Sequence, residues 1–168
     1  MKNKIFMIMA ILVLPYLPLT AQAVEENFRE GSLIIPMNST YQGGDDASND
    51  GGVMEAYGLV FALLDEGITI YWAINEDKAD PGDVDFVIED NTLDETEGEV
   101  VAKLYDHAGG LSDITFGSGD SYQRITYSGG PFIIDESEAA DAKAIINDSF
   151  WAAVDVHEAQ VPFAAPIY

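Results

Sequence analysis

The feature that most constrains this chain is a large excess of acidic residues with no cysteine to cross-link it. The 168 residues contain 30 Asp and Glu against 7 Lys and Arg, a formal net charge of −23 at pH 7. Mutual repulsion opposes a compact state, and no disulfide can offset it. The fold must therefore rest on its own apolar core, and a content of 48% apolar residues is enough to form one.

The first 23 residues have the pattern of a cleavable signal peptide. Lys2 and Lys4 supply positive charge, Ile5–Leu14 is apolar, and the small residues of Ala21–Ala23 precede a polar stretch. The apolar run is shorter than the roughly 20 residues that a membrane span needs. We therefore expect cleavage after Ala23, secretion to the periplasm or the medium, and no integral membrane segment in the mature chain.

The mature chain, residues 24–168, is predicted to be a single acidic domain. Loss of Lys2 and Lys4 leaves five basic residues against thirty acidic ones, a net charge of −25. Nucleic acids and anionic lipids bind basic patches, so neither is an expected partner. A bound cation, a basic protein partner and adaptation to a saline habitat each account for the acidity, and the sequence leaves all three open.

Hydrophobic periodicity predicts an α/β fold that begins with a strand, a helix and a strand. Apolar runs at Ser32–Met37 and Ile68–Ile74 are typical of buried strands, and Val53–Asp65 between them has helical spacing. The residues that recur at spacings of three and four are Val53, Tyr57, Val60, Phe61 and Leu64, and Leu59 and Leu63 flank them. Such a unit usually forms a right-handed crossover between parallel strands.

The remaining pattern is less regular. Further strands are predicted at Val84–Ile88, Glu99–Tyr105, Arg124–Tyr127, Pro131–Ile134 and Ala153–His157. Asp135 is placed to cap a helix over Glu136–Phe150, and 107–123 is expected to be mostly loop. The whole predicts a small, open, mostly parallel sheet of the Rossmann or flavodoxin type with an irregular β-rich middle.

Three segments carry a resemblance to a family. They are GSLIIPMNSTYQ at 31–42, GGVMEAYGLVFALLDEGITIYWAI at 51–74 and YSGGPFIID at 127–135. Together they resemble the N-terminal region of an uncharacterised family of large secreted bacterial proteins. The resemblance implies export and an α/β fold, and it brings no catalytic residues. It also implies that the domain is the N-terminal part of a larger unit.

Polar side chains follow the predicted strands at their carboxyl ends, where open parallel sheets bind ligands. Asn38 follows the first strand, Asn75 and Asp77 follow the second, and Asp135 follows a later strand taken as parallel. These four residues are therefore predicted to meet at one rim and to bind a cation or a polyol. The competing interpretation is that the acidic loops only solvate a highly charged protein.

The loop after the first strand is the candidate metal site. Asp46–Gly51 matches the first six positions of a calcium-binding loop, but position twelve is Tyr57 where a bidentate Glu is needed. The loop is therefore not an EF-hand, and an irregular Ca²⁺ site is the hypothesis. Its predicted ligands are Asp45, Asp46, Ser48 and Asp50.

No motif specifies a reaction. The serines of 117–119 and 128–130 lack the strand-to-helix setting of a nucleophile elbow, and His107 and His157 have no ligand partner at short spacing. Trp72 and Trp151 lie in apolar segments and are interpreted as core residues rather than sugar-stacking platforms.

The sequence therefore favours an exported, non-catalytic binding or assembly module with a calcium-dependent acidic rim. The alternative is a secreted hydrolase that uses carboxylates at the same rim. Another protein or a downstream domain is expected to dock on the apolar tail, Val161–Tyr168.

Overall fold

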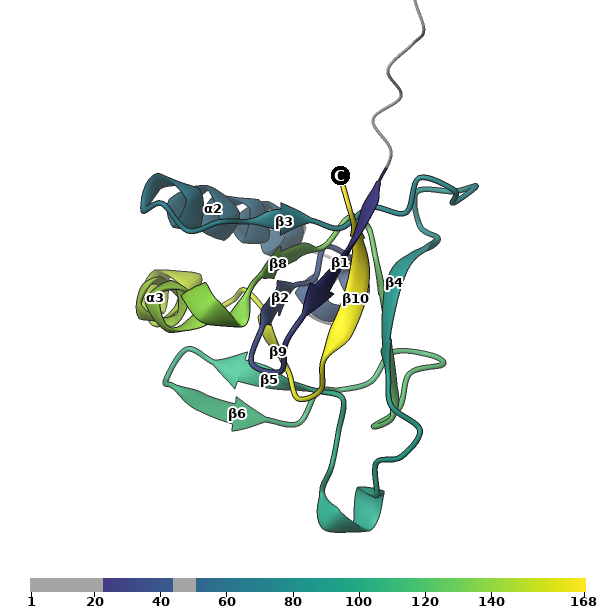
Figure 1. Cartoon of the computed structure of the whole chain (residues 1–168). Helices are drawn as coiled ribbons and strands as arrows, with labels where there is room; N and C mark the ends of the chain where they lie inside the picture. Colours follow the sequence, from purple (N-terminus) through teal and green to yellow (C-terminus); the bar gives the residue numbers. More distant parts are fainter. Residues whose placement is uncertain (1–22, 44–50) are drawn as a thin grey trace, which may run out of the picture.

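The computed structural model describes residues 23–43 and 51–168, which form a mostly β structure (Figure 1). Its strands are β1 (Val24–Phe28), β2 (Leu33–Ile35), β3 (Tyr71–Trp72), β4 (Val84–Glu89), β5 (Ala102–Asp106), β6 (Gly110–Ser112), β7 (Arg124–Ser128), β8 (Phe132–Ile134), β9 (His157–Ala159) and β10 (Phe163–Ile167). Its helices are α1 (Ser39–Gln42), α2 (Gly51–Asp65) and α3 (Glu136–Ile146), with 3-10 turns η1 (Glu95–Glu97) and η2 (Ser149–Trp151).

The central sheet has six strands in the order β3-β8-β2-β9-β5-β6, and all neighbouring strands are antiparallel. The prediction of a mostly parallel, Rossmann- or flavodoxin-like sheet is therefore wrong, as is the α/β fold that the family resemblance implied. Strands β2 and β3 do run in the same direction, but β8 lies between them and pairs with both, through Ile34↔Ile133 and Trp72↔Phe132. Hydrophobic periodicity predicts where strands lie in the sequence, but it does not predict the order of the strands in a sheet.

The same insertion occurs a second time. Strands β8 and β9 are joined through α3, and β2 lies between them. Two strand–helix–strand units are thus interleaved, which is the connectivity of the split, ferredoxin-like βαββαβ arrangement. Strands β4 to β7 form an insertion between its third and fourth elements, β3 and β8.

Three layers result from this arrangement. Helices α2 and α3 cover one face of the sheet, and the β1–β10 and β4–β7 pairs cover the other (Figure 1). Alternate side chains of β2 face opposite layers. Leu33 and Ile35 pack with the helices, and Ile34 packs with the two strand pairs. Phe163 of β10 stacks on Phe86 of β4 with ring centroids 5.5 Å apart, which joins the two strand pairs.

The apolar tail is part of this second layer. Strand β10 pairs along its whole length with β1, Phe163 and Ala165 are buried, and Tyr168 is exposed. Neither β1 nor β10 was predicted as a strand. Backbone hydrogen bonds from Ile74 N to Pro166 O (3.0 Å) and from Tyr168 N to Trp72 O (3.1 Å) also cover the outer edge of β3.

Helix α2 buries only part of the apolar repeat from which it was predicted. Its fully buried or nearly buried positions are Ala56, Leu59, Val60 and Leu63. Three residues of the repeat, Tyr57, Phe61 and Leu64, are exposed. Among the described residues, no helix has the length and apolarity needed to cross a membrane.

Candidate functional site

The four predicted ligand residues separate into two groups because β8 is antiparallel to its neighbours. Asn38 and Asn75 follow β2 and β3, which run in the same direction, so both lie at one end of the sheet. Asp135 follows β8 and therefore lies at the opposite end. There its carboxylate caps α3 by accepting from Ser137 N (3.0 Å) and Ser137 Oγ (2.6 Å). The prediction that Asp135 shares a rim with Asn38 and Asn75 is wrong.

The Asn38 side chain forms structural hydrogen bonds at the end of the sheet. Its Oδ1 accepts from Thr40 N (3.1 Å) and Tyr41 N (3.2 Å), which caps α1, and its Nδ2 donates to Ser128 Oγ (3.4 Å). The amide thus ties the end of β2 to the turn that precedes β8.

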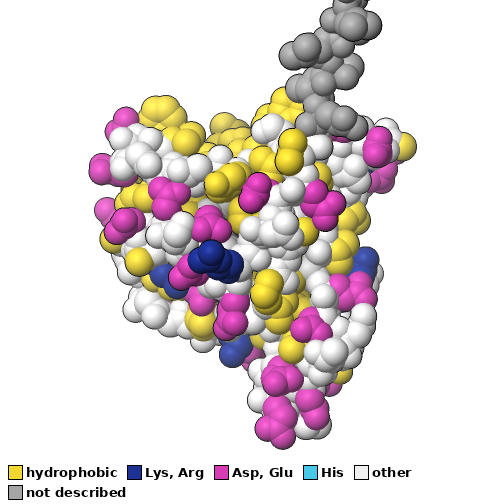
Figure 2. All heavy atoms as spheres, in the orientation of Figure 1, with side chains coloured by type: hydrophobic (Ala, Val, Ile, Leu, Met, Phe, Trp, Pro, Cys, Tyr) yellow, Lys and Arg dark blue, Asp and Glu magenta, His cyan; other side chains and the backbone are white. Residues whose placement is uncertain are grey.

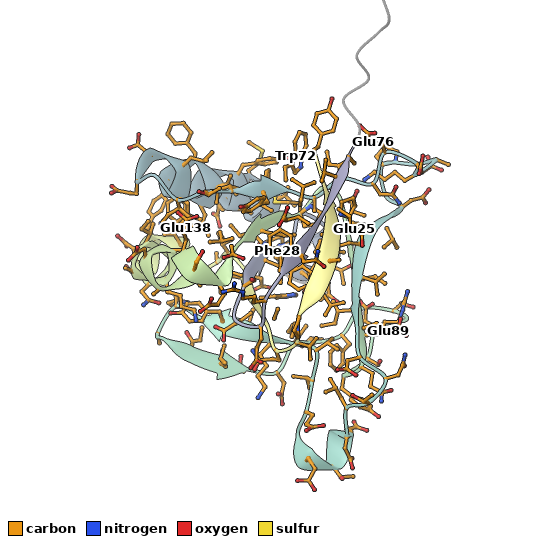
Figure 3. The ribbon with its side chains drawn as sticks, in the orientation of Figure 1. Glu25, Phe28, Trp72, Glu76, Glu89 and Glu138 are labelled. Carbon is orange, nitrogen blue, oxygen red and sulfur yellow. The ribbon has the colours of Figure 1, made fainter. Side chains whose placement is uncertain are left out.

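A cleft lies at this end of the sheet, next to Asn75. It is wide open to solvent and has a volume of about 480 Å³, and we call it the Trp72 cleft after the largest side chain in its wall. Its polar lining residues are Asn75, Glu76, Lys78 and Asp80, and Gly129 and Gly130 form part of its wall. Figure 3 places Trp72 and Glu76 at the same end of the molecule. Asp77 is exposed and is not in the lining, although its backbone N donates to Asn75 Oδ1 (3.0 Å).

A buried carboxylate holds the loop that forms one wall of the cleft. Asp85 is 3% exposed, and its Oδ1 accepts from Lys78 Nζ (2.7 Å) and Asn75 N (3.0 Å). Its Oδ2 accepts from Gly130 N (2.8 Å). Both oxygens are therefore occupied by donors of the protein, which is what a buried charge requires. Asp85 positions the 75–85 loop against the turn before β8 and has no oxygen free of protein donors.

Two consecutive glycines form another part of the wall. Gly129 and Gly130 have φ values of +80° and +72°, in the left-handed region that other residues avoid. A Cβ on Gly129 would lie 2.6 Å from Met37 O, and one on Gly130 would lie 2.7 Å from Trp72 Nε1. The close approach lets Gly130 O accept a 3.0 Å hydrogen bond from Trp72 Nε1, which fixes the indole.

The Trp72 indole is 42% exposed, so its interpretation as a core residue is wrong. It stacks on Phe132 with centroids 6.1 Å apart and planes at 19°, and the edge contact with Tyr168 is 6.3 Å between centroids. One indole face is thus supported from behind by the protein. The position of Trp72 explains this exposure, because β3 is an edge strand of the six-stranded sheet.

A second polar group lies inside the core. Tyr127 Oη and His157 Nδ1 share a hydrogen bond of 2.9 Å, and Tyr41 Oη donates to Asp120 Oδ2 (2.6 Å). Burial lowers the pKa of His157 to about 3 and raises the pKa of Tyr127, so both are neutral at pH 7. Sequence reasoning gave no sign of this pair, whose members are thirty residues apart.

The predicted calcium ligands Asp45, Asp46, Ser48 and Asp50 lie outside the described residues. Within 23–43 and 51–168, no three His, Asp or Glu side chains gather into a metal-binding group. The calcium site stays a prediction.

Comparisons of this chain with protein-family models, with curated proteins and with solved structures give no match. The resemblance to secreted bacterial proteins therefore also stays a prediction, and the function has to be argued from the residues of the Trp72 cleft.

Two signals in the sequence pointed to this cleft without being recognised. The first is the Ser128–Pro131 segment with its paired glycines, whose contact with Trp72 depends on β8 lying beside β3. The second is Lys78, which is one of only five basic residues after residue 23 and forms an ion pair with the buried Asp85.

Proposed function

We propose that the protein is an exported, non-catalytic binding module that holds a polyhydroxylated ligand, such as an oligosaccharide, in the Trp72 cleft. The observation that carries the proposal is a supported, 42% exposed indole beside a wall of amide, carboxylate and ammonium groups. The C–H face of a sugar ring packs on an aromatic face, while its hydroxyls exchange hydrogen bonds with such polar groups. The volume of about 480 Å³ is typical of small-molecule sites.

Preorganisation of the walls supports the proposal. The indole is already held by Gly130 O and by stacking on Phe132, so a ligand need not order it. Lys78 Nζ contacts Asp85 Oδ1 (2.7 Å) and Pro81 O (3.3 Å) among the described residues. An ammonium group has three N–H donors, which leaves one for a ligand hydroxyl.

The charge of the cleft favours a neutral ligand over an anionic one. Glu76 and Asp80 are exposed at its rim, and the mature chain has a net charge of −25. A phosphate or carboxylate ligand would be repelled at long range. Export rests on the pattern of residues 1–23, and N-terminal sequencing of the extracellular or periplasmic protein should give Val24 as its first residue.

Tryptophan fluorescence tests the ligand directly. Trp151→Phe leaves Trp72 as the single tryptophan, and Trp72→Phe leaves Trp151 as the matched control. We expect at least one of cellotetraose, xylotetraose, maltotetraose and chitotetraose to change the emission of the Trp151→Phe variant and to leave the Trp72→Phe variant unchanged. Calorimetry should show at least tenfold weaker binding for Trp72→Ala, since an aromatic anchor dominates such a contact.

Three results would contradict this function. Absence of any response in the Trp151→Phe variant rules out the oligosaccharide, and unchanged affinity in Trp72→Ala rules out the cleft. Shortening of a tetraose by the wild-type protein that is lost in Glu76→Gln would instead establish the hydrolase alternative.

A further inference from the structure

Helix α2 presents a row of large apolar side chains to solvent. Met54, Tyr57, Phe61 and Leu64 follow one another at spacings of three, four and three residues, and Met54 and Phe61 are 69% and 72% exposed. We call these four side chains the α2 ridge. Spacings of three and four place residues on one side of a helix, in the pattern with which helices pack along one another.

The opposite side of the same helix is also apolar. Ala56, Leu59 and Leu63 are fully buried against the sheet, so α2 has apolar side chains on both its inner and outer sides. A helix of this kind is usually buried all round. The neighbouring helix α3 serves as an internal comparison, because none of its exposed residues is a large apolar one.

Aromatic contacts extend the ridge across the sheet edge. Tyr57 packs edge-on against Phe132 at 5.9 Å between centroids, Phe132 stacks on Trp72, and Trp72 contacts Tyr168. Tyr168 is itself 65% exposed. Figure 2 shows apolar atoms along the edge of the molecule where α2, β3 and the chain terminus lie. A cluster of exposed large apolar side chains is typical of an interaction site.

The charges around the ridge decide which partner fits. Glu55, Asp65 and Glu66 are exposed on or just after α2, and the helix has no Lys or Arg. The basic residues of the mature chain lie on other elements or turns: Arg29, Lys78, Lys103, Arg124 and Lys143. A second copy of this chain would bring the same carboxylates and a net charge of −25 to the contact, and an anionic membrane would be repelled as well.

We propose that the α2 ridge is a docking surface for an amphipathic helix of a partner protein whose apolar stripe is flanked by Lys and Arg. The 15 residues of α2 span about 22 Å, which matches two heptads of a partner helix lying alongside. Basic flanking residues would lie beside Glu55, Asp65 and Glu66 and would give the contact its specificity. None of the four ridge residues lines the ligand cleft, although Trp72 of the cleft adjoins the ridge through Phe132.

Three labelled 18-residue peptides test the partner chemistry by fluorescence anisotropy with the exported protein. The first has Leu at spacings of three and four with Lys on both sides, the second is a scrambled isomer with the same charge, and the third carries Glu in place of Lys. We expect the first to bind at least tenfold more tightly than either other peptide. Phe61→Glu should weaken that binding at least tenfold, since one central aromatic residue dominates such contacts.

Leu111→Glu is the matched control, because Leu111 is an exposed apolar residue on β6, the far edge strand. It should leave peptide binding unchanged, and both variants should melt like the wild type. Equal binding of the scrambled peptide, or full binding by Phe61→Glu, would overturn the proposal. A dimer in sedimentation that Phe61→Glu dissociates would also overturn it, because the occupant would then be a second copy. Phe61→Glu should keep any oligosaccharide response, so failure here is distinct from failure of the cleft.

Discussion

His157 should make the stability of this protein fall as the solution is acidified from pH 7.5 to 5.5. Burial lowers the pKa of His157 to about 3, whereas an unfolded histidine titrates near 6.5. Above pH 6.5 the side chain is neutral in both states, so its contribution to the free energy of unfolding is constant. Below pH 6.5 the unfolded state binds a proton that the folded state cannot bind, and the folded state is disfavoured.

The size of the effect follows from the two pKa values. At pH 5.5 about ten of every eleven unfolded chains carry the proton, which lowers the free energy of unfolding by about 1.4 kcal/mol relative to pH 7.5. At pH 5.0 the loss reaches about 2 kcal/mol. Asp155 lines the same small cavity as His157, and burial raises its pKa. Its folded form therefore gains a proton more readily at lower pH, which opposes the loss, so measurements should stop at pH 5.0.

Urea unfolding of wild type and His157→Asn at pH 7.5, 6.5, 5.5 and 5.0 tests this reasoning. Asparagine keeps a group that can hydrogen-bond Tyr127 but does not titrate, so the variant should be less stable at every pH and should lack the acid-dependent loss. The difference between the two proteins should shrink by about 1.4 kcal/mol from pH 7.5 to 5.5. His107→Asn, at an exposed position, is the control and should follow the wild-type curve. A constant difference between wild type and His157→Asn would refute the argument.

Two further predictions concern the acidic residues. Asp85→Asn should lower the free energy of unfolding by about 3 kcal/mol, because it removes the charge that pairs with Lys78 and places an NH2 donor where one carboxylate oxygen accepted from Lys78 or Gly130 N. Arg124→Met, which breaks an ion pair of two exposed side chains, should cost less than about 1 kcal/mol. Thermal melts that give the two variants equal losses would contradict this. If residues 45–50 bind calcium, millimolar Ca²⁺ should raise the melting temperature of the protein by several degrees over EDTA at matched ionic strength. The reason is that filling a site to ~100 times its dissociation constant adds ~2.7 kcal/mol to the free energy of unfolding. The double variant Asp46→Ala, Asp50→Ala should abolish the rise.

Local features of the fold could be predicted from the sequence. The cap of α3 by Asp135 is confirmed, because a capping residue and the N–H groups it accepts from are adjacent in the chain. Strands β2, β4, β7 and β8 also lie where apolar, β-branched runs predicted them. These features depend on contacts within a few residues, which a sequence pattern records directly.

Pairing between distant strands could not be predicted in the same way. Placing β8 between β2 and β3 reverses its direction relative to a parallel sheet, and this single fact moves Asp135 to the far end and brings Gly130 beside Trp72. Asn38 and Asn75 do lie at the same end of the sheet, because β2 and β3 run in the same direction. The cleft itself depends on which strand is the neighbour, and that is decided by packing of the whole domain.

Which side of α2 is buried could not be predicted for a different reason. Apolar residues occur on nearly every side of this helix, so several phases of the 3.6-residue period fit equally well. The apolar residues on several sides of α2 are themselves informative, because a helix that packs only against the core of its own domain has a polar solvent-facing side. The surplus apolar side of α2 is the reason that we assign it to a partner.

The acidity of the chain also has a local explanation that the net charge alone conceals. Several aspartates accept a hydrogen bond from the backbone N–H two residues later, as in Asx turns and helix caps. They are Asp90, Asp94, Asp106, Asp135 and Asp148. In three of them the residue two positions on is Ser or Thr, whose hydroxyl also donates to the carboxylate and lowers its pKa. The motif Asp-x-Ser/Thr is therefore a better guide to turns in this chain than to ligands. Where a carboxylate already accepts a hydrogen bond from a nearby backbone N–H, we expect the acidic loop to bind neither a cation nor a sugar.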